Sequence, residues 1–280
     1  MSSAPKEYLL SPLVQEKNQR PTGNRRYFFL ALEIVTIIGA VILCFSVVHQ
    51  SQVQAKLELN DKLMVTLKGC RGEPGLETVR DLLRQGANAN AANTGSNSLT
   101  ALMVASSRGY PDLVKLLLDS GADVNAKGKV LVQGAGGDFV LDGITPLWAA
   151  AFSGDVQVVR MLIDHGADLT ALDSRGASVM LCARSNDVVQ TFLDHGLDIN
   201  ARDMDGNTLL TVSVLAYADA KPNAFSARAP TSRMPDVGFL LLHGADPNVR
   251  NRDGLTPLRA AQGRALAALI ALLNKAGAKE

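Results

Sequence analysis

The stretch "GITPLWAAAFSGDVQVVRMLIDHGADLTALD" (Gly143–Asp173) carries the marks of two short helices followed by a closing glycine. Thr145 can accept the free backbone N–H groups at a helix start, and Pro146 follows at a position where a first-turn proline is tolerated. An Ala-rich segment and then a Leu/Val-rich segment lead to Gly166, which suits a left-handed cap at a helix C-terminus. The stretch therefore predicts a helix-turn-helix unit.

The same two markers recur along most of the chain. The closing glycine is found at positions 86, 121, 166, 196, 244 and 277, with successive spacings of 35, 45, 30, 48 and 33 residues. Each closing glycine except the first is preceded by a Thr or Ser that opens an apolar segment. These residues are Thr100, Thr145, Ser178, Thr208 and Thr256. A period near 33 residues with two long intervals predicts a repeat array with insertions.

These residues resemble the ankyrin repeat, whose units open with T-P-L-H-x-A and end in G-A-D-x-N-A. The resemblance implies an all-α fold, an ankyrin-repeat α-solenoid over residues 57–280. It is most specific in repeats two, three and six; repeat one lacks the opening motif, as expected of a capping repeat, and repeat four is about three residues short. The approximate repeats are 57–91, 92–126, 143–171, 173–201, 203–249 and 251–280.

Two insertions interrupt the array. Residues 127–142 contain the β-prone runs "KVLVQ" and "DFVL" around "GAGG", which predicts a β-hairpin. No Gly-Lys-Ser/Thr follows these glycines and no helix opens there, so the pattern does not indicate a nucleotide site. Residues 217–233, rich in proline and small residues, predict a mobile, mildly basic loop that separates the two helices of repeat five.

Acidic residues and histidines lie close together at the repeat ends. They permit two interpretations: a metal site or proton relay, and a structural role at the helix ends. His165, His195 and His243 each precede the closing glycine of repeats three to five. Because stacked helices lie about 8–10 Å apart, the first and third imidazoles would lie roughly 16–20 Å apart, too far to share one zinc ion. The spacing favours a structural role at the helix C-terminus.

The three cysteines indicate neither a disulfide nor a zinc site. Cys44, Cys70 and Cys182 show no CxxC spacing. Cys70 and Cys182 belong to repeats one and four, three intervals or roughly 24–30 Å apart, whereas a disulfide needs Cα atoms within about 7 Å. We expect Cys182 to be a small core residue.

A long apolar stretch precedes the array. "YFFLALEIVTIIGAVILCFSVV" (residues 27–48) has 22 residues, so a helix there would span roughly 33 Å, the thickness of a bilayer core. It exceeds the apolar region of a cleavable signal peptide. The sequence predicts a single transmembrane helix between a disordered tail (1–26) and a linker (49–56).

Lysine and arginine residues are more numerous before this stretch than after it. Lys17, Arg20, Arg25 and Arg26 precede it, and Lys56 and Lys62 follow. The bias predicts a cytoplasmic N-terminus and an extracytoplasmic array, in the periplasm if the source is bacterial. Glu33 is the one costly residue in the stretch; it is either tolerated near the interface or forms a contact with another membrane helix.

Composition and the resemblance together indicate a partner. The formal net charge of +1 argues against nucleic acid, and no cofactor or catalytic residue is indicated. Ankyrin repeats bind proteins with their turn tips and first helices, which here implies a binding face containing Ser107, Arg108, Tyr110, Phe152, Ser153, Arg175 and Met204. Phe152 is the strongest anchor candidate; Trp148 either fills a gap between helices or protrudes toward a ligand.

The sequence leaves three functional interpretations. The preferred one is a membrane-tethered ankyrin scaffold that binds a protein partner and performs no catalysis. The second is an accessory subunit of a membrane protein complex, contacting it through the anchor helix and Glu33. The third is an enzyme or metal protein that uses the Asp/His-rich turns.

Overall fold

The computed structural model describes residues 23–69, 75–93, 97–134, 137–219, 234–264 and 266–279. Only the backbone is described for residues 23–37, 40, 133, 134, 137, 218 and 219. The chain divides into two compact units, Met1–Ala55 and Lys56–Glu280.

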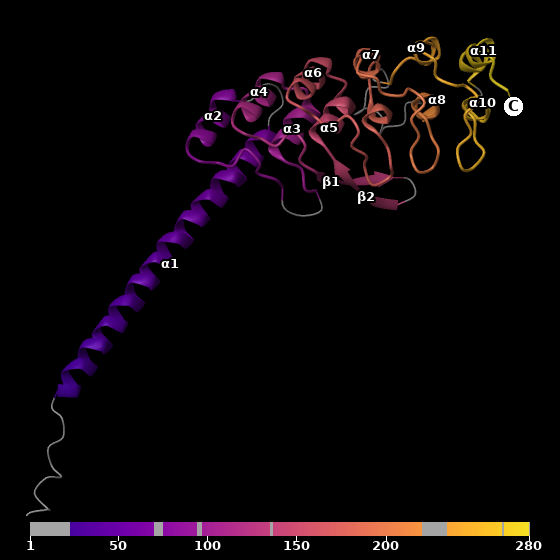
Figure 1. Ribbon diagram of the computed structural model, residues 1–280. Helices are drawn as coiled ribbons and strands as arrows, with labels where there is room; N and C mark the ends of the chain where they lie inside the picture. Colours follow the sequence, from indigo (N-terminus) through magenta and orange to yellow (C-terminus); the bar gives the residue numbers. More distant parts are fainter. Residues whose placement is uncertain are drawn as a thin grey trace, which may run out of the picture. The chain divides into compact units, whose positions relative to one another are not determined.

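Paired short helices stacked in a row make up the second unit (Figure 1). The last turns of α1 (Gly23–Gly69) begin it. The first helices α3, α5, η2, α8 and α10 pack side by side in one layer, and α2, α4, α6 and α7 pack side by side in a second layer. The bounds after α1 are α2 Leu76–Arg84, α3 Ala101–Arg108, α4 Pro111–Asp119, α5 Pro146–Ser153, α6 Val156–Asp164, η2 Val179–Cys182, α7 Asn186–Asp194, α8 Leu209–Asp219, α9 Val237–Leu242, α10 Pro257–Gln262 and α11 Ala267–Lys275.

The helix starts and ends follow from the repeated residues. The hydroxyl groups of Thr100, Thr145 and Thr256 each accept a hydrogen bond from a backbone N–H in the first turn of α3, α5 and α10. The closing glycines have positive φ, for example 85° at Gly166 and 81° at Gly196, a backbone conformation that costs other residues free energy. Both predicted roles are confirmed at these positions.

Repeat four departs from the pattern at its first helix. The apolar run "VMLC" forms only the 3-10 turn η2, and the Ser178 side chain makes no capping hydrogen bond. The second helix α7 has the usual nine residues. The shortening predicted for repeat four is therefore located in its first helix.

Asparagine side chains connect the ends of neighbouring repeats. Asn125 donates to the Gly166 carbonyl (3.0 Å) and accepts from the Asp168 N–H (2.8 Å). Asn90 and Asn200 form the same pair of bonds one repeat earlier and two repeats later. Each amide thus joins two repeats through backbone groups that a left-handed glycine cap leaves available.

Thr170 occupies this asparagine position at the junction of repeats three and four. Its hydroxyl donates within its own turn to the Asp168 carboxylate at 2.7 Å, and this bond, with the Thr170 N–H, lowers the pKa of Asp168. Among the described residues, the Thr170 side chain forms no bond to repeat four. This junction therefore lacks the asparagine connection, although the Arg184 N–H donates to the Ala151 carbonyl and the Ser185 hydroxyl donates to the Gly154 carbonyl across it.

Thr170→Asn is expected to raise the free energy of unfolding by about 1 kcal/mol, because two hydrogen bonds form at the cost of one ordered side chain. Urea unfolding followed by circular dichroism measures the change. Thr170→Ala is the control and should not stabilise the chain. Equal stability of the Asn and Ala variants would contradict the bridging role.

Helix α1 covers the segments predicted as a transmembrane span (27–48) and a linker (49–56). Residues 49–56, predicted as a linker, are helical. The tail at residues 1–22 and the side chains of residues 23–37, including Glu33, lie outside the described residues. Among the residues that the structure describes, no helix is long and apolar enough to cross a membrane.

Candidate functional site

A two-stranded hairpin extends the turn between α4 and α5. Strands β1 (Gly128–Gly134) and β2 (Gly137–Ile144) are antiparallel, with Val130 opposite Leu141 and Val132 opposite Phe139. The Ser98 N–H donates to the Lys129 carbonyl (2.9 Å), and the Lys129 N–H donates back to the Ser98 carbonyl (3.1 Å). These bonds fix the hairpin beside the turn tip of the preceding repeat. The hairpin predicted for residues 127–142 is confirmed.

An apolar cleft of about 820 Å³ lies between this hairpin and the first helices. The hairpin contributes β-branched and aromatic side chains, while α3 and α5 contribute Met103, Trp148 and Phe152. The rim carries Asp173, Arg175, Arg184 and Asp203. A concave apolar surface with few polar groups is the usual form of a binding site.

Two stacked aromatic rings line one wall of this cleft. The rings of Trp148 and Phe152 lie 5.4 Å apart between centroids and 7° from parallel. Phe152 is 46% exposed. The Trp148 Nε1 is buried and has no hydrogen-bond partner among the described residues, which is costly unless an acceptor is supplied.

Arg184 follows the shortened first helix of repeat four, at a point in the repeat where the longer first helices still continue. Its backbone N–H donates to the Ala151 carbonyl at 3.1 Å, and its guanidinium carbon lies 4.6 Å from the centroid of the Phe152 ring. The Nη1 atom contacts the Met234 sulfur. Burial lowers the pKa of Arg184, because the charged form loses solvation.

Arg184 also lines a second, polar cleft of about 840 Å³ beside the first. The carboxylate of Asp155 lines it too, but accepts the Gln157 and Val158 N–H groups as the cap of α6. Asp236 likewise caps α9. Arg184 is therefore shared by both clefts, and the two capping carboxylates are engaged by helix backbone.

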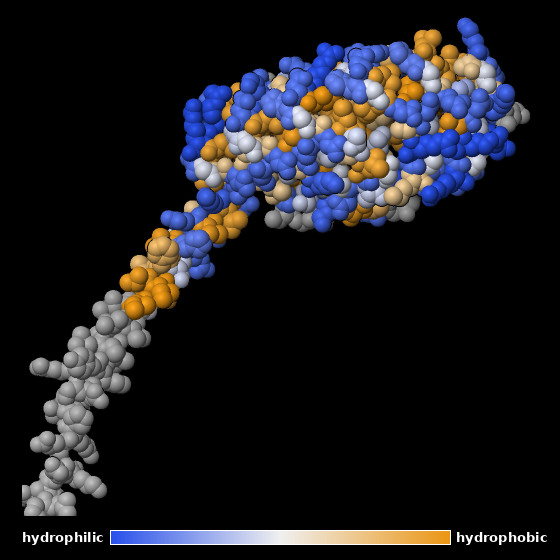
Figure 2. Space-filling model, in the orientation of Figure 1, coloured by the Kyte–Doolittle hydropathy of each residue, from blue (hydrophilic) through white to orange (hydrophobic). Residues whose placement is uncertain are grey.

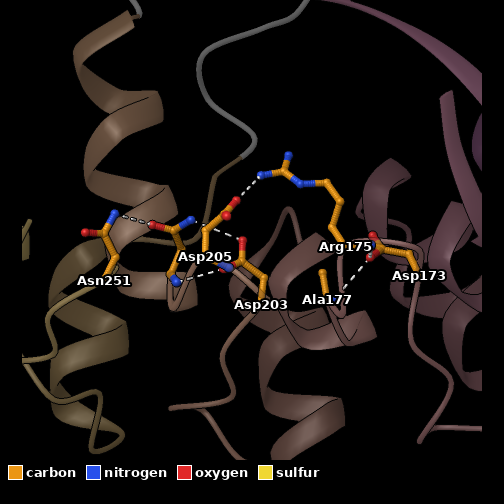
Figure 3. A network of polar contacts seen from close by, with 7 residues as sticks. Asp173, Arg175, Ala177, Asp203, Asp205 and Asn251 are labelled. Atoms are coloured by element: carbon orange, nitrogen blue, oxygen red, sulfur yellow. Dashed lines mark hydrogen bonds and ion pairs between the residues drawn. The ribbon is translucent and has the colours of Figure 1, made fainter. Parts of the chain in front are cut away.

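The turn tips beyond the hairpin are held together by polar side chains (Figure 3). Arg175 pairs with Asp205 at 2.9 Å across two neighbouring tips. Asp203 accepts the backbone N–H of Asp205 and of Asn207, and the Asn207 side chain accepts from Asn251. These bonds hold neighbouring tips together, and of the residues involved Arg175 and Asp203 line the apolar cleft.

The match to known families follows the same repeats. Residues 128–203 match the family described as "Ankyrin repeats (3 copies)", and residues 97–129 match "Ankyrin repeat". Residues 97–203 are ankyrin repeats. Such repeats are typically non-catalytic binding modules and suggest a protein-binding scaffold. No curated protein matches the chain.

The residues of the binding face predicted from sequence do not form one surface; they lie in the two clefts, against the core and on the exposed surface. Ser107, Phe152 and Arg175 line the apolar cleft, whereas Arg108 and Ser153 line the polar cleft. Tyr110 is half-buried and packs against the core. Met204 is exposed and lies outside both clefts; its N–H donates to the Arg175 carbonyl at 2.8 Å.

The cleft contains residues that the ankyrin pattern did not indicate. Phe139 comes from the hairpin insertion and is 40% exposed. Arg184 follows the shortened helix, so its position depends on the missing turn rather than on a motif. The three-residue deletion in repeat four was the available sequence signal for Arg184.

The three histidines lie at helix ends. Each is the C-terminal cap residue of its helix, and its Nδ1–H donates to the carbonyl four residues earlier, at 2.7 Å in His165 and His195 and 2.8 Å in His243. A carbonyl accepts only, so Nδ1 carries the proton. Within the described ranges, no three His, Cys, Asp or Glu side chains are placed to hold a metal ion.

The thiols behave as expected where they are described. Cys182 is buried, and burial, followed by the nearby Asp173 carboxylate, raises the pKa of its thiol, which leaves it protonated and unreactive. Cys70 lies outside the described residues.

Proposed function

We propose that the apolar cleft is the surface with which this ankyrin array binds a protein partner. The observation that carries the proposal is the stacked pair of Trp148 and Phe152, part-exposed beside a wall of hairpin side chains. Large aromatic side chains at the centre of a concave apolar patch supply most of the binding energy in many interfaces. The ordered turn tips would provide the polar rim.

Phe152→Ala is expected to weaken partner binding at least tenfold, because the ring is both the exposed anchor and the support of Trp148 and Arg184. The measurement is affinity capture by the full chain in detergent, with each captured protein quantified against the variant. Leu242→Ala is the matched control, since Leu242 is 87% exposed but lies outside both clefts. Equal capture by the Phe152 variant and the unmodified chain would refute this site.

We also propose that residues 27–48 anchor the protein in a membrane. The described side chains in this part of α1 support it, because Ile38, Val41, Ile42, Leu43 and Phe45 are all more than half exposed, up to 78% at Phe45. Figure 2 shows hydrophobic residues on the surface of the described part of this helix, next to the grey segment. Exposed apolar side chains in such a run are costly in water and favourable in lipid. The excess of Lys and Arg before the stretch favours a cytoplasmic N-terminus and an extracytoplasmic array.

Alkaline phosphatase fused after residue 56 should be active in a bacterial host, because the enzyme folds only outside the cytoplasm, where its disulfides form. A fusion after residue 26 is the control and should be inactive. An inactive phosphatase together with an active cytoplasmic reporter at residue 56 would reverse the proposed orientation. Contact of Glu33 with another membrane helix stays a prediction that crosslinking from the membrane segment can test.

A further inference from the structure

Arg184 carries a charge that the described part of the chain leaves without an ion pair. Arg80, Arg84, Lys115 and Arg175 form ion pairs in the described part of the chain, and Arg184 does not. The Arg184 guanidinium instead contacts the Phe152 ring and the Met234 sulfur, and its buried Nε has no hydrogen-bond partner there. A partly desolvated guanidinium of this kind gains most from a carboxylate that completes its hydrogen bonds.

Four of the five carboxylates that line the clefts with Arg184 are engaged by backbone N–H groups, and the fifth, Asp187 in the first turn of α7, forms no ion pair with Arg184. Asp173 accepts the Arg175 and Ala177 N–H groups at 2.8 and 2.9 Å, and Asp203 accepts the Asp205 and Asn207 N–H groups. Asp155 and Asp236 cap helices. Because these groups organise turns and helix starts, turning one of them toward Arg184 would leave backbone N–H groups unsatisfied.

The position of Arg184 also restricts the geometry of an incoming carboxylate. The guanidinium lies against the Phe152 ring at 4.6 Å, and the same ring forms a wall of the apolar cleft. A ligand that fills the cleft with an apolar side chain therefore has its next side chain on the same face close to Arg184. In an extended peptide, side chains two positions apart lie on one face, roughly 7 Å apart.

We infer that the partner segment carries a carboxylate two residues from a bulky apolar side chain, with the apolar side chain in the cleft and the carboxylate on Arg184. This inference rests on the proposed function of the cleft. Arg184 then selects among apolar segments, since a segment without the acid leaves the guanidinium desolvated and unpaired. The Phe152 ring provides affinity and Arg184 provides specificity.

The test is selection of a random 12-residue peptide library, displayed on phage, against the full chain in detergent micelles. The unmodified chain should enrich peptides with Asp or Glu two positions away from Phe, Trp, Leu or Met. Arg184→Gln should lose the enrichment of acids and keep that of apolar residues. Arg160→Gln, an exposed arginine on α6 outside both clefts, is the matched control and should select as the unmodified chain does.

A synthetic enriched peptide and its amide counterpart, with the carboxylate changed to a carboxamide, then give dissociation constants. The unmodified chain should bind the acid about tenfold to a hundredfold more tightly than the amide, as for one charged hydrogen-bonded pair, whereas Arg184→Gln should bind both alike. Arg184→Lys keeps the charge and should retain a weakened preference for the acid. It replaces Arg184→Gln if circular dichroism shows the latter to be unfolded.

The outcomes separate this inference from the proposed function. Peptides that need Phe152 but show no preference for acids overturn the inference and leave the cleft as a binding site. An equal acid preference in the unmodified chain and in Arg184→Gln overturns the assignment to Arg184. Failure to enrich any peptide on the folded chain counts against both.

Discussion

Phe192→Ala is expected to lower the free energy of unfolding by about 3–5 kcal/mol, the largest effect of any substitution considered for this chain. Phe192 is fully buried (0% exposed) in α7, the full-length helix of the repeat whose first helix is only a 3-10 turn. Its removal opens a cavity within the repeat that contains η2, the shortest first-layer element, which has few side chains that could move to fill the cavity. The loss therefore combines burial and cavity terms.

Thermal unfolding followed by circular dichroism would register the Phe192 variant as a fall in Tm of roughly 6–20 °C. Phe152→Ala is the matched control, since it removes the same atoms from a half-exposed position, and it should change Tm far less. If the two variants are equally stable, the core assignment of α7 is wrong.

Gly128→Ala is expected to cost about 3 kcal/mol and to weaken binding in the apolar cleft. A Cβ atom at Gly128 would lie 2.5 Å from the Ser98 carbonyl oxygen and 2.7 Å from the Met103 sulfur. The methionine side chain can turn away, but the carbonyl belongs to the backbone that pairs with Lys129. The hairpin must shift, which combines overpacking with the loss of backbone hydrogen bonds.

Urea unfolding measures the stability of the Gly128 variant, and amide exchange at Lys129 reports whether the hairpin has separated from the turn tip. Gly263→Ala is the control, because its φ of −56° is helical and its Cβ would approach no atom closer than 3.4 Å. It should be neutral or slightly stabilising. Protection of the Lys129 amide unchanged from that in the unmodified chain would show that the close approach is not restrictive.

Much of the fold was predictable because the repeat positions are fixed by local backbone chemistry. A closing glycine needs positive φ, an opening threonine accepts a first-turn N–H, and both requirements act within a few residues of sequence. The hairpin was predictable for the same reason, since β-prone runs flanked its glycines. The loop predicted for 217–233 was placed too early, as α8 continues to Asp219; its remainder lies outside the described residues.

The site was less predictable because it depends on contacts between repeats. Phe152 was identified because an aromatic residue is unusual on that face, and Trp148 was left between a packing role and a ligand contact. Its ring is half-buried and also lines the cleft, so the two alternatives are not exclusive. Phe139 lies in an insertion and Arg184 follows a deletion. Where an insertion or a deletion places a side chain relative to the next repeat cannot be read from the sequence of one repeat.

The junction between repeats three and four lacks the asparagine amide and is held by other contacts, such as the hydrogen bond from the Arg184 N–H to the Ala151 carbonyl. In a linear stack each unit is held only by its neighbours, so these contacts keep repeats one to three and repeats four to six together. The apolar cleft spans this junction, with Trp148 on one side and Cys182 and Arg184 on the other. An occupant of the cleft would contact both halves of the array. Its binding would therefore raise the free energy needed to separate them.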